Sequence, residues 1–169
     1  FPTGKGQTAP IQNPYAYGNA WFVENVKYVQ NANQEIEALG TILPTKTAVV
    51  ADNFKQALNG VQTAFKDSLS TVKLTSYAPN ALTYETSSSK DGVVVFSEVY
   101  YPGWQAYLDG KAVQHGRADY ILRAMNVPAG KHKIEFKFDP QSIHTTENIA
   151  YVALGLLILG AIGVIVIEV

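Results

Sequence analysis

The sequence predicts a mainly β protein: a β-sandwich of jelly-roll type with one short helix, followed by a C-terminal transmembrane helix. Three observations predict this class. Short segments that alternate apolar and polar residues recur from Val72 onward, tight-turn sequences separate them, and the run Ile149–Ile167 carries no charged side chain. Regularly spaced short strands of this kind are typical of sandwiches. A helix rising ~1.5 Å per residue needs ~20 apolar residues to cross a bilayer, and the run just meets that requirement.

We expect four parts along the chain. Residues 1–20 are rich in Gly, Pro, Asn and Gln and are interpreted as an extended arm. Residues 21–140 are predicted to form an extracytoplasmic sandwich head, residues 141–148 a polar hinge, and residues 149–167 the transmembrane helix. The chain begins at Phe1 without a signal peptide, so we expect a fragment of a longer protein.

The apolar run could alternatively be a buried core element, because its β-branched end, Val164–Ile167, would also suit a central strand. Gly155, Gly160 and Gly163 favour the membrane. A glycine costs about 1 kcal/mol in a water-exposed helix but is common in membrane helices, where small residues let helices approach closely.

The sequence predicts few regular elements in the N-terminal half of the head. Trp21–Val29 is a strand candidate, and Thr47–Val50 is a short strand. Residues 31–40 predict the short helix, because Asn31 can cap its start, Gln34 stands three residues later as in a capping box, and Gly40 can end it. Residues 54–65 remain open between a loop and an irregular helix.

The second half predicts successive strands separated by turns. Asp91-Gly92 and Asp109-Gly110 are each predicted to join adjacent antiparallel strands through a tight turn with glycine at positive φ. The strands are expected at Val72–Tyr77, Ala81–Thr86, Val93–Tyr101, Trp104–Leu108, Lys111–Val113, Tyr120–Met125 and Lys133–Phe138.

Composition excludes several kinds of chemistry. The 169 residues contain no cysteine, which rules out disulfides, thiolate metal sites and cysteine nucleophiles. Thirteen basic and fourteen acidic residues give a net charge of −1, so nucleic-acid binding has no support. His115, His132 and His144 are far apart in sequence and are expected on the surface, and we predict no metal site and no cofactor.

Aromatic residues around a Pro-Gly turn are the main candidates for ligand binding. Tyr100, Tyr101, Trp104 and Tyr107 offer flat apolar faces with polar edges, which suit stacking on sugar rings. Strand periodicity sends Trp104 and Ala106 to one face and Gln105 and Tyr107 to the other, so core packing is the preferred role of Trp104.

Charged residues that follow this segment are the second candidates. Arg117, Asp119 and Arg123 could bind a carboxylate, a phosphate or sugar hydroxyls. The favoured alternative is a surface ion pair that braces the loop between strands.

Two stretches carry a family resemblance. Phe96–Lys111 includes Tyr-Tyr-Pro-Gly-Trp followed by Asp-Gly-Lys, and with Gly116–Tyr120 and Val127–His132 it resembles the C-terminal region of the YfhO family of bacterial multipass membrane proteins. Asn13–Val23 resembles an earlier extracytoplasmic segment of that family. The resemblance covers most of the chain from Asn13 onward.

The resemblance implies membrane glycosyltransferases that use polyprenyl-phosphate sugars and glycosylate cell-envelope polymers such as teichoic acids. Their catalytic acidic residue lies in an early outer loop, so no catalytic residue is assigned in this chain. We therefore expect a non-catalytic accessory domain on the extracytoplasmic (periplasmic) side of the bacterial cell membrane. Its expected partners are the membrane, through Ile149–Ile167, and envelope glycan or the parent's other helices. The alternative is a membrane-anchored carbohydrate-binding or protein-assembly module.

Overall fold

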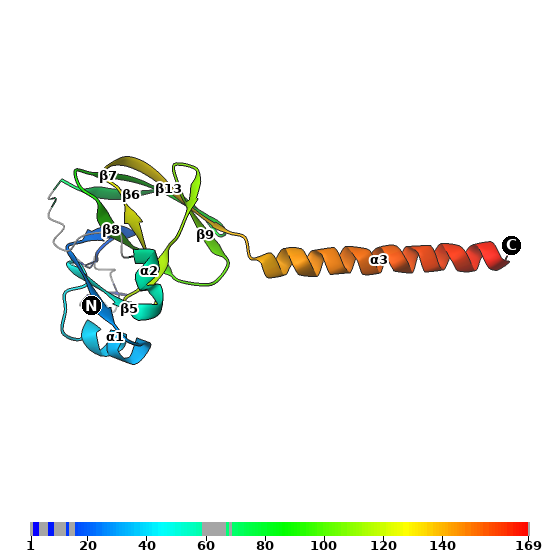
Figure 1. The fold of residues 1–169 in the computed structure, drawn as a ribbon, viewed down its shortest axis with the longest axis horizontal. Coiled ribbons are helices and arrows are strands. Elements are labelled where there is room, and N and C mark those ends of the chain that lie inside the picture. Colours follow the sequence, from blue (N-terminus) through cyan, green and yellow to red (C-terminus); the bar gives the residue numbers. More distant parts are fainter. Residues whose placement is uncertain are drawn as a thin grey trace.

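The computed structural model describes Asn13, residues 16–58, Asp67 and residues 69–168, together with the short antiparallel strands β1 (Pro2–Thr3) and β2 (Gln7–Thr8). Most of the predicted arm, residues 1–20, therefore lies outside the described residues. So does the second half of the open segment 54–65. The head and the long helix α3 (Gln141–Glu168) that leaves it are shown in Figure 1.

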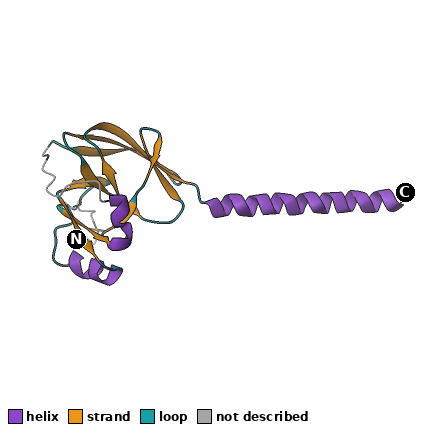
Figure 2. Cartoon of the chain, viewed as in Figure 1, coloured by secondary structure: helices purple, strands orange, loops and turns teal. Residues whose placement is uncertain are grey.

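Two antiparallel sheets form the sandwich, which confirms the predicted fold class (Figure 2). The five-stranded sheet has the order β10 (Lys111–Val113), β9 (Trp104–Leu108), β13 (Gly130–Phe138), β7 (Ala81–Ser88) and β6 (Thr71–Ala78). The four-stranded sheet has the order β11 (Gly116–Ala118), β12 (Leu122–Val127), β8 (Gly92–Val99) and β3 (Ala20–Val23).

The core lies between these sheets and is built on aromatic contacts. Tyr84, Phe96 and Phe136 are fully buried. The ring centroid of Phe96 lies 4.9 Å from that of Tyr84 and 4.9 Å from that of Phe136, both in edge-to-face arrangements. Such pairs contribute about 0.5–1.5 kcal/mol each beyond the area they bury. Alternate residues of β7 and β13 point into this core, which is the period-two pattern that predicted the strands.

A parallel strand pair stands beside the sandwich. β4 (Asn25–Val29) pairs with β5 (Thr47–Ala51), and α1 (Ala32–Leu39) makes the crossover that parallel strands require. The predicted strand Trp21–Val29 is therefore two strands that belong to different sheets, β3 and β4. Asn31 caps α1 as predicted, with its Oδ1 accepting from the Gln34 N–H at 3.1 Å.

The open segment begins as irregular helix within the described residues. A 3₁₀ turn, η1 (Asp52–Phe54), passes into α2 (Lys55–Leu58). Leu58 is fully buried, and a Cβ added at Gly116 would lie 3.1 Å from its Cδ1. α2 thus packs closely against β11.

The two Asp-Gly turns behave differently. Asp109-Gly110 closes the β9–β10 hairpin with φ of 50° and 79°, as predicted for a two-residue turn. The prediction for Asp91-Gly92 was wrong. Gly92 begins β8, which pairs with β12 and β3, so the segment crosses from one sheet to the other and joins no hairpin. The Asp91 carboxylate instead accepts the backbone N–H of Ala129 at 2.8 Å, which ties this crossing to the one between β12 and β13.

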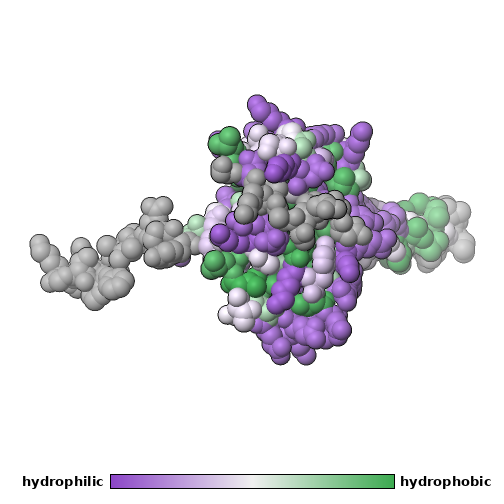
Figure 3. Space-filling model, turned by 60° about the vertical axis from the view of Figure 1, so that its left-hand side comes forward, coloured by the Kyte–Doolittle hydropathy of each residue, from purple (hydrophilic) through white to green (hydrophobic). Residues whose placement is uncertain are grey.

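α3 is a single helix of 28 residues, and its first two turns are the segment 141–148 that the sequence suggested as a hinge. Residues Gln141–Gly163 are long and apolar enough to cross a membrane, with a mean hydropathy of 1.6 and no buried part. The visible face of the head is mostly hydrophilic, whereas hydrophobic residues cover the described part of α3 in view (Figure 3).

Candidate functional site

The Tyr100–Trp104 turn is locked to the start of α3. Gly103 has φ +103°, and a Cβ added there would lie 2.8 Å from Cβ of Pro140, so the turn needs glycine at this position. The Asp139 N–H donates to the Gly103 carbonyl at 2.9 Å. The imidazole of His144 contacts the Asp139 carboxylate. The turn, the end of β13 and the first turn of α3 therefore form one unit.

A groove of about 450 Å³ opens at this junction. Tyr101 forms one wall with its side chain 61% exposed, and its ring centroid lies 6.3 Å from that of Phe138. Gln141 and Ser142 of α3 add polar groups, and Ile143 adds an apolar one. This junction groove combines an accessible aromatic face with hydrogen-bonding side chains, as sugar-binding surfaces do.

Trp104 serves the core, as its strand position predicted. It packs against the buried cluster between the sheets, and the guanidinium carbon of Arg123 lies 4.0 Å from its ring centroid. Arg123 is only 2% exposed, and its Nε donates to the Val99 carbonyl at 3.0 Å. Burial lowers the pKa of Arg123. Both residues hold the sheets together at this end, so the candidate ligand role of Arg123 gains no support.

Tyr100 is packed between aromatic rings. Its ring centroid lies 5.1 Å from that of Phe54 and 5.5 Å from that of His115. His115, which was expected on the surface, is half-buried, and its Nε2 is shielded from solvent. Burial, together with the positive charge of Arg123, lowers the pKa of His115 to about 4. Tyr100 thus anchors the turn, and Tyr101 is the tyrosine that the turn presents.

Tyr107 lies on the outward face of the five-stranded sheet, away from the junction groove's walls. Its hydroxyl donates to Oε1 of Gln105 at 3.0 Å, and Nζ of Lys137 lies 5.0 Å from its ring centroid. This position confirms the predicted alternation along β9. It leaves Tyr107 on a polar surface of its own.

Arg117 and Asp119 brace the parallel pair against the sandwich. Arg117 NH2 lies 3.0 Å from Oε2 of Glu35, which is fully buried on α1. The Tyr120 N–H donates to the other oxygen of Glu35 at 2.9 Å. Oδ1 of Asp119 accepts the Val49 N–H at 2.8 Å, and burial raises the pKa of Asp119 to about 6. This geometry supports the bracing role more than ligand binding.

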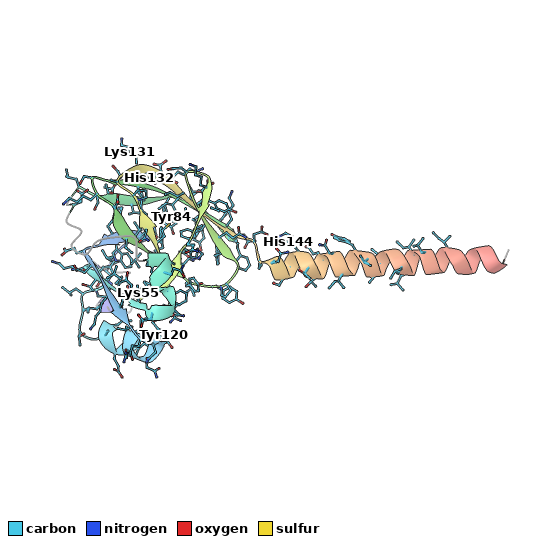
Figure 4. All side chains as sticks on the ribbon, in the orientation of Figure 1. Lys55, Tyr84, Tyr120, Lys131, His132 and His144 are labelled. Carbon is cyan, nitrogen blue, oxygen red and sulfur yellow. The ribbon has the colours of Figure 1, made fainter. Side chains whose placement is uncertain are left out.

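The structure brings only part of the candidate set together. Tyr100, Tyr101 and Trp104 share the turn, whereas Tyr107, Arg117 and Asp119 do not line the junction groove. Tyr120, next to Asp119, lies beside α1, and His144 lies at the start of α3 (Figure 4). Sequence reasoning missed Glu35 and the α3 residues of the groove. Among the described residues, no three metal-binding side chains come together.

Fold and site define a β-sandwich domain joined directly to a helix long enough to cross a membrane. The sequence profile of the family described as bacterial membrane protein YfhO matches residues 41–149, which is most of the chain, so the protein belongs to the YfhO family. No curated protein and no solved structure matches the chain significantly.

Proposed function

We propose that this chain is the non-catalytic extracytoplasmic domain of a membrane glycosyltransferase-like protein, and that it holds envelope glycan at the membrane surface through the junction groove. The observation that carries the proposal is the placement of exposed Tyr101 in a groove built jointly by the head and the first turn of α3. Membership of a bacterial membrane protein family supports the membrane setting.

The groove's height above the bilayer supports this role. From Gln141 to Ile149, where the apolar run begins, α3 advances eight residues, or roughly 12 Å at 1.5 Å per residue. The polar interfacial layer of a bilayer is about 5–7 Å thick on each side. With the hydrocarbon core beginning at Ile149 and α3 along the bilayer normal, the groove would open just outside the headgroups, where a growing polymer or a lipid-linked sugar would pass.

The contact is expected to be weak. One sugar ring stacked on Tyr101 contributes on the order of 1 kcal/mol beyond area burial, by analogy with aromatic pairs. Affinity for a short oligosaccharide should then be roughly millimolar, near −4 kcal/mol. Weak binding suits a surface that must release the polymer after each transfer.

NMR titration of the full chain in detergent micelles with envelope oligosaccharides tests the proposal. Signals of residues 101–103 and 141–143 should shift saturably, and Tyr101→Ala should weaken binding roughly fivefold. Tyr77→Ala is the matched control, because Tyr77 is an equally exposed tyrosine on β6 outside the groove. Absence of shifts in a well-folded chain, or equal effects of the two variants, would refute glycan binding at the groove.

A protein-assembly role is the second candidate. Val99, Tyr101 and Ile121 are exposed apolar side chains at 58%, 61% and 50%, and the Tyr100 N–H donates to the Ile121 carbonyl, which holds their backbones side by side. Such a cluster also suits contact with another part of a larger membrane protein. Chemical crosslinking of the protein in its membrane tests this role. If Ile121→Ser abolishes a specific crosslink to a partner while glycan binding is unchanged, the result would favour the protein-assembly role.

A further inference from the structure

A second hollow, of about 530 Å³, lies on the outward face of the five-stranded sheet. Strand register places its side chains in two rows across β6, β7 and β13. In one row Thr71 stands opposite Ser87, which stands opposite Lys131. In the next row Lys73 stands opposite Glu85, which stands opposite Lys133. We call this surface the sheet groove.

Uncompensated charges line the sheet groove. Lys73 and Lys131 are exposed and have no ion-pair partner among the residues that the structure describes. Nζ of Lys133 is engaged with Oε1 of Glu135 at 3.3 Å. Glu85 stands between two lysines in register, yet it too makes no ion pair within the described part of the chain. Two free ammonium groups and one free carboxylate therefore share one hollow with the hydroxyls of Thr71 and Ser87.

A fixed rim closes one side of the sheet groove. Oδ2 of Asp109 lies 2.7 Å from Nδ1 of His132, and Oδ1 accepts the Lys133 N–H at 2.9 Å. Nε2 of His132 in turn lies 3.1 Å from the Ala129 carbonyl oxygen. Asp109 makes no ion pair with Lys73 or Lys131 within the part of the chain that the structure describes. Its hydrogen bonds hold the rim in place independently of any ligand.

We propose that the sheet groove binds a saccharide unit that carries a phosphate or carboxylate group. The ammonium groups of Lys73 and Lys131 match the charged oxygens, because charge-assisted hydrogen bonds are the stronger ones. The Glu85 carboxylate accepts from sugar hydroxyls, and the hydroxyls of Thr71 and Ser87 both donate and accept. The Glu85 carboxylate repels a small anion such as phosphate. The same carboxylate accepts hydrogen bonds from the hydroxyls of a sugar ring, so the site favours an anionic group that is attached to a sugar.

The position of the sheet groove excludes the headgroups of the anchoring membrane as its ligand. Lys131 precedes Phe138 by seven residues of β13, or roughly 23 Å at ~3.3 Å per residue. Lys131 and His132 lie at the part of the head away from α3 (Figure 4). This separation is more than twice the Debye length of about 8 Å at physiological salt. The ligand must therefore reach outward from the membrane or come from solution.

The experiment is an NMR titration of the full chain in neutral detergent micelles. Four probes are compared: glucose 1-phosphate, glucuronate, glucose and inorganic phosphate. The first two distinguish phosphate from carboxylate, glucose removes the charge, and inorganic phosphate removes the ring. We expect at least one charged sugar to shift signals of β6, β7 and β13 saturably, more tightly than glucose or inorganic phosphate, and less tightly as salt is raised.

Variants assign the binding to the sheet groove. Lys73→Gln and Lys131→Gln should each weaken the charged sugar roughly three- to fivefold, as expected for exposed charge pairs. Lys27→Gln is the matched control, an exposed lysine on β4 outside the groove, and should leave affinity unchanged. Tyr101→Ala should also leave it unchanged, which separates this site from the junction groove.

Three results would overturn the proposal. One is a lack of saturable shifts with both charged sugars. Another is binding of inorganic phosphate as tight as that of the better charged sugar, which would mark simple anion attraction. The third is a loss in Lys27→Gln or Tyr101→Ala equal to that in the groove variants.

Discussion

Replacing the buried carboxylate of Asp119 by an amide should change how the stability of the head depends on pH. Asp119 is 6% exposed, and burial raises its pKa from 3.8 to about 6. Asp119→Asn is a conservative change, because asparagine tolerates the positive φ of 51° and keeps an oxygen for the Val49 N–H. It removes the titration and places an amide group where Oδ2 is buried without a hydrogen-bond partner, an effect that does not change with pH.

The sign follows from proton binding in the two states. Above pH 6 the carboxylate is ionised in both folded and unfolded chains, and the folded chain bears the cost of a buried charge. As pH falls below 6, the folded chain takes up a proton that the unfolded chain does not yet bind, so the wild type gains stability. A difference of 2.2 units (6 − 3.8) at 1.36 kcal/mol per unit sets a limit of about 3 kcal/mol.

Urea unfolding of both chains at about pH 7.5 and about pH 4.5 measures the effect, and the wild type should gain about 2 kcal/mol relative to Asp119→Asn over this interval. Other groups cancel in the difference, including His115, whose lowered pKa acts in the opposite direction in both chains. Asp109→Asn supplies a contrast, because the hydrogen bond from His132 lowers the pKa of Asp109 and its stabilisation is lost as pH falls. Identical pH profiles for the wild type and Asp119→Asn would refute the reasoning.

Three further changes test the fold. Gly110→Val should destabilise the head by about 1–2 kcal/mol in urea unfolding, because φ is +79° there and a β-branched residue is strained at positive φ; an unchanged midpoint would contradict the turn assignment. Glu35→Ala should cost about 2–4 kcal/mol, since it leaves Arg117 and a backbone N–H without their partner, whereas Glu37→Ala on the exposed face of α1 is the control with little effect. Deleting residues 149–169 should leave a soluble head with the same circular dichroism signal from strands, and cooperative unfolding at a much lower temperature than the full chain would indicate that the helix belongs to the core.

Sequence patterns correctly predicted the elements whose geometry depends only on residues that are close together in the chain. Asp109-Gly110 formed its hairpin because a two-residue turn depends only on its own φ values and its flanking strands. The same dipeptide at Asp91-Gly92 did not, because the pairing of β8 with β12 and β3 decides where the chain goes next. Trp21–Val29 divided between two sheets for the same reason.

The site was predictable only in its turn. Tyr100, Tyr101 and Trp104 lie within five residues of one another, so their clustering around Pro102-Gly103 follows from sequence. The role of Arg117 depends on Glu35, which lies 82 residues earlier and is buried only in the folded chain. No local pattern distinguishes Glu35 from the exposed Glu37 beside it on α1. The α3 wall of the junction groove likewise requires knowing that residues 141–148 are helical.

Because α3 is one continuous helix from Gln141 into the apolar run, the direction in which the head faces around the helix axis depends on the number of residues in the segment 141–148. A helix turns by ~100° and rises ~1.5 Å for each residue, so a single insertion among residues 141–148 would rotate Tyr101 by more than a quarter turn while barely lifting it. An insertion of seven residues would nearly restore the direction but add ~10 Å of height. The number of residues in this polar segment therefore sets the direction in which the junction groove faces. It also sets the height of the groove above the bilayer, and the two vary separately.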